Sequence, residues 1–223
     1  MALNPTKVAI AKDLCHRFVN LRQPCERRSL IKKFKNPQIL DEMESRGLCT
    51  QQKNREEYLP TAGSFALLDD NDPILERARL GTTAALHTLK NMFEVEQTTT
   101  QYTLHDLALH ANEIYPNPIP HEYLRLGLYL VREFGALQMT RPSSDGLQIE
   151  SFTIAEHIVT IDPDDAWAQR VRNAKEAASE VSVLRRAIEQ LGWQAQEEEP
   201  QAESGPRNEG RQRTDVEENG PVR

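Results

Sequence analysis

The amino-acid sequence predicts a mainly helical α+β fold in which small β-hairpins follow groups of helices. Three observations predict it: a repeated pattern, strong helix-start signals and short apolar segments joined by polar turns. In the repeated pattern, an amphipathic helix ends at a glycine, and a short apolar segment, a polar tip and a second apolar segment follow. The glycine is Gly47 in the first copy and Gly135 in the second, and the tips lie at residues 53–55 and 143–146. Glycine readily ends a helix in the left-handed conformation, and paired apolar segments around polar turn residues are typical of a hairpin.

The first copy contains signals for three helices. The first helix is expected to begin after Asn4, with Pro5 at an early helical position. Residues 25–35 are predicted to form the second helix, with an apolar stripe and a separate basic ridge. The third begins with Asn36 as its cap and Pro37 in its first turn, and it runs to the first glycine.

The second copy repeats this organisation after a polar linker. A long helix is predicted from the Asp72–Pro73 pair to about residue 93. Thr103 and Asp106 have the spacing of a capping box and start a helix that ends near residue 112. The third helix covers residues 121–134 and ends at the second glycine.

Residues 162–193 are predicted to form a C-terminal helix, because Asp162 and Pro163 supply a cap and a first-turn proline. Its apolar residues alternate in spacings of three and four, which is typical of a coiled-coil seam. The stripe fits two interpretations: a short parallel dimer seam, or packing against the second copy. The dimer interpretation assigns the contact to Val181, Leu184, Ile188 and Leu191.

Residues 194–223 are predicted to be a disordered acidic tail. This stretch has four residues from the hydrophobic set, Ala195, Ala202, Val216 and Val222. So little apolar surface cannot offset the conformational entropy lost on ordering the chain.

The order of two shorter helices, then helix, glycine, strand, tip and strand, resembles the winged-helix superfamily over roughly residues 5–155. The resemblance implies two tandem winged-helix domains, at residues 1–68 and 73–160. Tandem winged helices occur in transcription regulators, in replication initiators and in adaptors such as accessory subunits of bacterial condensin complexes. The resemblance therefore implies a fold more firmly than a function.

Charge is distributed unevenly along the chain. The net charge is −7, yet residues 1–58 contain 12 Lys and Arg against 7 Asp and Glu. The acidic total argues against a broad nonspecific binder of polyanions, but it leaves room for a local basic face in the first copy. The third helix of a winged helix usually enters the major groove. Here that helix contains Asp41, Glu42 and Glu44, so base readout by it is not expected.

The candidate nucleic-acid-binding residues therefore lie on the second helix and at the hairpin tip. They are predicted to anchor DNA phosphates with little direct base readout. A solvated basic helix face is an equally good interpretation of the same pattern. The candidates are Arg27, Arg28, Lys32, Lys33, Lys35, Lys53 and Arg55.

No catalytic, cofactor-binding or metal-binding motif is found in the sequence, and an enzyme is not expected. The three cysteines are widely spaced without a CxxC pair, and the six histidines form no zinc-finger pattern. Neither a secretion signal nor a membrane-spanning run is found, so a soluble, cytoplasmic protein is expected. The leading hypothesis is a DNA-binding regulatory protein that contacts double-stranded DNA. The alternative is a protein-interaction adaptor that uses the same fold as packing surfaces and forms a homodimer or binds a protein partner.

Overall fold

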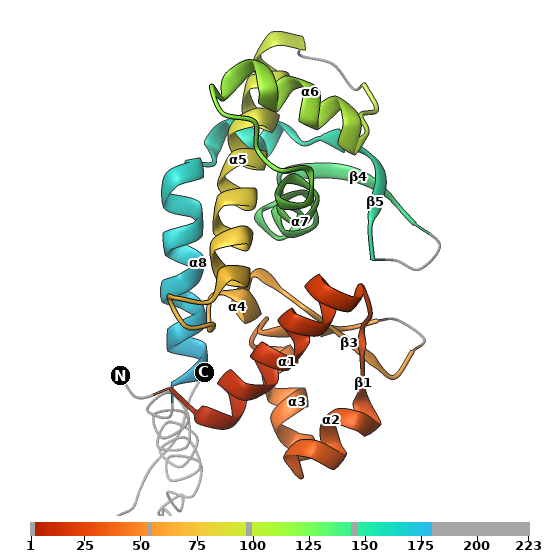
Figure 1. Ribbon diagram of the computed structural model, residues 1–223, viewed down its shortest axis with the longest axis vertical. Coiled ribbons are helices and arrows are strands. Elements are labelled where there is room, and N and C mark those ends of the chain that lie inside the picture. The colour runs from red at the N-terminus through yellow and green to blue at the C-terminus, as the bar shows by residue number, and fades with distance from the viewer. Residues whose placement is uncertain (1–2, 53–54, 97–99, 144–146, 180–223) are drawn as a thin grey trace, which may run out of the picture. The chain divides into compact units, whose positions relative to one another are not determined.

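The computed structural model describes residues 3–52, 55–96, 100–143 and 147–179. This part of the chain is mainly helical with small antiparallel sheets (Figure 1), as the sequence predicts. None of the helices in these ranges is both long enough and apolar enough to cross a lipid bilayer.

The first segment combines helices with a small sheet. Its elements are α1 (Pro5–Leu21), β1 (Cys25–Glu26), α2 (Arg27–Phe34), α3 (Pro37–Ser45), β2 (Cys49–Gln51) and β3 (Glu57–Pro60). Strand β3 lies between β1 and β2 and is antiparallel to both. The short helix α4 (Ala62–Phe65) follows β3 directly.

The expected start of the second helix at residue 25 was wrong by two residues. Cys25 and Glu26 instead form β1, in which they pair with Tyr58 and Glu57 of β3. The backbone N–H of Arg27 also donates to the carbonyl of Glu56, at 2.7 Å. A two-residue strand has no periodicity of its own, so its partner, more than thirty residues away in the chain, decides its conformation.

The second segment begins with the longest described helix and ends with a hairpin. Its elements are α5 (Pro73–Glu96), α6 (Leu104–Ile114), α7 (His121–Val131), the 3₁₀ turn η1 (Arg132–Phe134), β4 (Leu137–Pro142) and β5 (Ile149–Ile154). Tyr102 forms an isolated antiparallel bridge with Phe152 of β5. A second 3₁₀ turn, η2 (Glu156–Thr160), leads into α8 (Pro163–Ala178).

The local helix signals of the sequence are confirmed. The Asn4 side chain accepts from the backbone N–H groups of Thr6 and Lys7, and Asn36 caps α3 in the same way. Thr103 and Asp106 form a reciprocal capping box. Gly47 and Gly135 follow their helices with φ values of +67° and +71°, the left-handed region that favours glycine.

Helix α7 is buried on both of its faces. Leu124, Leu128 and Val131 pack into a core with α5 and α6. On the opposite side, Leu126 and Tyr129 join a cluster that includes Phe18 of α1. The Phe18 and Tyr129 ring centroids lie 4.6 Å apart, and the Tyr129 hydroxyl donates to the carbonyl of Pro60 at 3.1 Å. One hydrophobic cluster therefore spans both segments.

The backbones of α5 and α7 touch where two glycines meet. A Cβ built on Gly127 would overlap the carbonyl of Gly81, and one on Gly81 would overlap the carbonyl of Tyr123. Such a close approach is available only to residues without a side chain, so the two glycines fix how these helices cross.

Helix α8 ends earlier than the sequence pattern suggests. Ser179 is extended, with ψ of 145°, and it forms an antiparallel bridge with Leu3. The prediction of one uninterrupted helix over 162–193 was therefore wrong at this residue, because pairing with the N-terminal segment replaces the helical conformation. Ala174 and Ala178 pack into the core of the first segment, not the second. Val181, Leu184, Ile188, Leu191 and the tail at 194–223 lie outside the described residues.

Candidate nucleic-acid interface

The basic residues of α2 differ in how strongly they are held by neighbouring groups. Arg27 is partly buried, and its guanidinium donates to Asp41 at 3.0 Å and to the Tyr58 hydroxyl at 2.9 Å. The hydrogen bond with Asp41, together with the nearby charge, raises the pKa of Arg27. Arg27 therefore joins α2 to α3 and β3, and it is poorly placed to contact a phosphate.

The remaining candidates on α2 project from its surface. Lys33 pairs with Asp13 of α1, and Arg28 lies 3.8 Å from Glu56 with a side chain that is 91% exposed. Lys32 and Lys35 are exposed, and neither forms an ion pair within the described part of the chain. Lys32 and Lys33 lie in the last turn of α2, where positive charges interact favourably with the negative end of the helix dipole. This interaction is an ordinary structural reason for cations at this position.

The hairpin contributes one described candidate. Arg55 is 56% exposed and lies 3.7 Å from Glu57. Lys53 lies outside the described residues. Among the described candidates, the structure thus leaves Arg28, Lys32, Lys35 and Arg55 as the exposed cations most accessible to a phosphate backbone.

The carboxylates of α3 are held by groups in the same segment. Asp41 pairs with Arg27, and Glu44 accepts from the backbone N–H of Gln51 at 3.0 Å. Glu42 pairs with Lys7 at 2.8 Å and with Arg46 at 3.0 Å. The carboxylates of α3 therefore make contacts with α1, α2 and β2.

The outward face of α3 has few groups that could read bases. Gln38, Asp41 and Ser45 are exposed on it. Arg46 follows the helix but points inward: its side chain is 8% exposed, and it donates to the Ala177 carbonyl at 2.6 Å. Little direct base readout by this helix stays a prediction.

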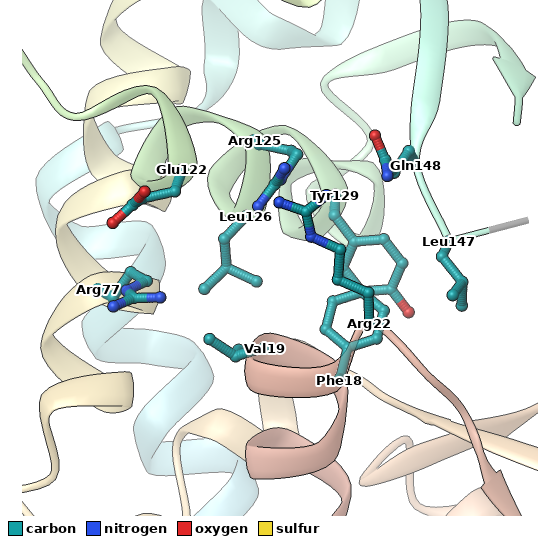
Figure 2. A pocket seen from close by; sticks show the side chains of 10 residues that line it. All are labelled: Phe18, Val19, Arg22, Arg77, Glu122, Arg125, Leu126, Tyr129, Leu147 and Gln148. Atoms are coloured by element: carbon teal, nitrogen blue, oxygen red, sulfur yellow. The ribbon is translucent and has the colours of Figure 1, made fainter.

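An arginine cluster forms a pocket that the sequence analysis did not identify. Arg22, which directly follows α1, lines the same pocket as Arg77 of α5 and Arg125 of α7 (Figure 2). Glu122 also lines it, beside apolar side chains such as Leu126. No sequence signal could identify this cluster, because its members are about fifty residues apart in the chain and the fold brings them together.

The cysteines and acidic groups give no sign of a metal centre in the described ranges. No group of three or more His, Cys, Asp or Glu side chains there is placed to hold a metal ion. Cys15, Cys25 and Cys49 are free, buried thiols. Burial raises the pKa of Cys25 to about 11 and that of Cys49 to about 12, so both stay protonated and unreactive at neutral pH.

Comparisons of this chain with protein-family models, with curated proteins and with solved structures found no match.

Proposed function

We propose that the chain is a tandem winged-helix protein that binds double-stranded DNA as a regulatory protein. The support for two copies is their shared order of elements. In the first segment β1 lies between the first two helices and pairs with the second hairpin strand. In the second segment Tyr102 occupies the same place in the order and bridges β5, the second strand of its hairpin.

The observation that carries DNA binding is the set of exposed cations on α2 and the neighbouring hairpin. Lys32 and Lys35 have no carboxylate partner in the described part of the chain, and Arg28 and Arg55 have only long, exposed ion pairs. Exposed ion pairs at such distances contribute little to stability, so replacing the carboxylate partner with a phosphate costs little free energy. These cations would position the DNA through contacts with its phosphate backbone. Helix α3 would read little or none of the base sequence.

The double variant Lys32→Gln, Lys35→Gln is expected to bind duplex DNA at least tenfold more weakly than the unmodified protein. Each phosphate contact that is lost removes about 0.9 from the slope of log affinity against log salt, so the slope should fall by about 1.8. Fluorescence anisotropy with a labelled duplex across a salt series measures both quantities.

The matched control is the Lys12→Gln, Lys175→Gln double variant. It removes the same net charge from exposed lysines on α1 and α8. Its affinity and salt slope should stay close to those of the unmodified protein. Equal losses in the two double variants would mean that net charge alone governs binding, and the assignment to α2 would then be wrong.

A protein-interaction adaptor is the second candidate, and the burial of α7 favours it. The third helix of the second copy, α7, packs on the core of the second segment and on the first segment. Both of its faces therefore make contacts within the protein. The seam residues Val181, Leu184, Ile188 and Leu191 would supply the dimer contact in this proposal.

A chain ending at Ser179 tests the adaptor proposal without damaging the described core. Trp167, Ala174 and Ala178 are buried and must be kept, so a cut before α8 would confuse loss of folding with loss of pairing. We expect the full chain to elute as a dimer and the shortened chain as a monomer in light-scattering chromatography. A dimer that persists in the shortened chain would exclude the seam as its cause.

A further inference from the structure

Three helices each contribute one arginine to a small pocket (Figure 2). Arg22 lies at the C-terminal end of α1, Arg77 in the second turn of α5 and Arg125 in α7. The pocket has a volume of about 40 Å³. A single water needs about 10–15 Å³ on this scale, so the pocket has room for a group with a few heavy atoms. Arg22 and Glu122 are exposed, so the pocket can be reached from solvent.

The positive charge in this pocket is only partly offset by the protein, because three arginines and one carboxylate, that of Glu122, line it. Elsewhere Arg27, Arg46 and Arg170 pair with carboxylates. Within the described residues, neither Arg22, Arg77 nor Arg125 lies within 4.0 Å of a carboxylate oxygen. Glu122 lines the pocket without forming such a pair.

Two further features describe the surroundings of the arginines in this cluster. The Nε atom of Arg77 is buried and has no hydrogen-bond partner in the described part of the chain, although its guanidinium lies 5.4 Å from the Tyr123 ring centroid. Burial and the neighbouring charge of Arg22 lower the pKa of Arg125, and Arg77 adds to this effect while Glu122 opposes it. A bound anion would neutralise the arginines that now repel one another.

We propose that this pocket binds the phosphate group of a small molecule through Arg22, Arg77 and Arg125. Guanidinium groups present planar pairs of N–H donors that match phosphate oxygens, and charge-assisted hydrogen bonds of this kind are strong. Val19 and Leu126 line the same pocket and give an apolar contact for the rest of the ligand. The site lies beside α1, α5 and α7, whereas the proposed DNA surface lies on α2 and the neighbouring hairpin.

Calorimetric titration of the full chain with inorganic phosphate and with phenyl phosphate tests the site, with chloride at equal ionic strength as reference. We expect saturable binding of both anions and tighter binding of phenyl phosphate. Arg125→Gln should raise the dissociation constant at least tenfold, since it removes charge-assisted hydrogen bonds. If no saturable binding beyond the chloride reference occurs in the unmodified chain, the proposal is wrong.

Arg22→Gln is the second variant, because Arg22 is exposed and its replacement should leave folding intact. It should weaken phosphate binding as Arg125→Gln does, and circular dichroism would verify that both variants are folded. The control is Arg172→Gln, which removes a 63% exposed arginine from α8. Unchanged phosphate affinity in Arg22→Gln, or an equal loss in Arg172→Gln, would overturn the assignment.

A labelled DNA duplex distinguishes a small-molecule phosphate from a DNA phosphate as the source of the anion. For a small-molecule site, Arg22→Gln should lose phenyl phosphate affinity while its duplex affinity changes less than twofold. If Arg22→Gln instead loses as much affinity for the duplex as for phenyl phosphate, and phenyl phosphate competes with the duplex, the pocket belongs to a DNA surface and the small-molecule proposal fails.

Discussion

Replacing Gly127 with alanine is expected to lower the free energy of unfolding by about 3 kcal/mol, near the upper end of the usual cost of overpacking. The added Cβ would overlap the backbone of Gly81 in α5, and backbone atoms cannot rotate out of the way as a side chain can. Alanine is the better helix former by about 1 kcal/mol, which offsets only part of the clash. Urea denaturation followed by circular dichroism measures the change.

The control for this prediction is Gly47→Ala. Gly47 has a φ of +67°, but a Cβ there would meet no atom within 4 Å. Its cost should be limited to the left-handed backbone, about 1 kcal/mol. If Gly127→Ala unfolds at the same urea concentration as the unmodified protein, α5 and α7 cannot be in backbone contact, and the burial of α7 between two cores would be refuted.

Replacing Glu42 with glutamine is expected to destabilise the protein by a similar amount, about 3 kcal/mol. Lys7 is 1% exposed and pairs with Glu42, and the largely buried Arg46 pairs with the same carboxylate. The substitution removes the negative charge and leaves buried cations whose desolvation is no longer compensated. Because Arg46 also donates to Ala177, the loss should loosen the end of α8 as well. Chemical denaturation gives the magnitude, and hydrogen exchange at residues 174–178 tests the effect on α8.

Asp41→Asn is the matched control for Glu42→Gln. It removes one carboxylate from the same helix, but the side chain is 58% exposed and its loss should cost less than about 1 kcal/mol. Adding Lys7→Met to Glu42→Gln should recover part of the stability, because an apolar side chain of similar length needs no counter-charge. Equal stability of Glu42→Gln and Asp41→Asn would mean that Lys7 is hydrated and not buried.

The capped helix starts and the two glycine stops could be predicted from the sequence because each depends on neighbouring residues. Asn4, Asn36 and Asp162 cap backbone N–H groups two or three positions ahead of them. Gly47 and Gly135 accept a left-handed conformation that other residues avoid. The helix–glycine–hairpin order that recurs in both copies is therefore readable without knowing the fold.

The candidate interface could be predicted only in part, because charge pairing depends on distant residues. The sequence identifies the basic residues of α2, but it does not show that Arg27 pairs with Asp41 and that Lys33 pairs with Asp13. The early end of α8 is likewise a distant effect, since Ser179 pairs with Leu3.

The sequence by itself determined the helical α+β class, the capped helix starts and the two glycine stops, because capping and turn preferences act within a few residues. Only the tertiary structure decided that α7 is buried on both faces, that Glu42 forms ion pairs with Lys7 and Arg46, and that three arginines line one pocket. These features come from packing and electrostatic contacts between segments far apart in the chain, for which no local pattern exists.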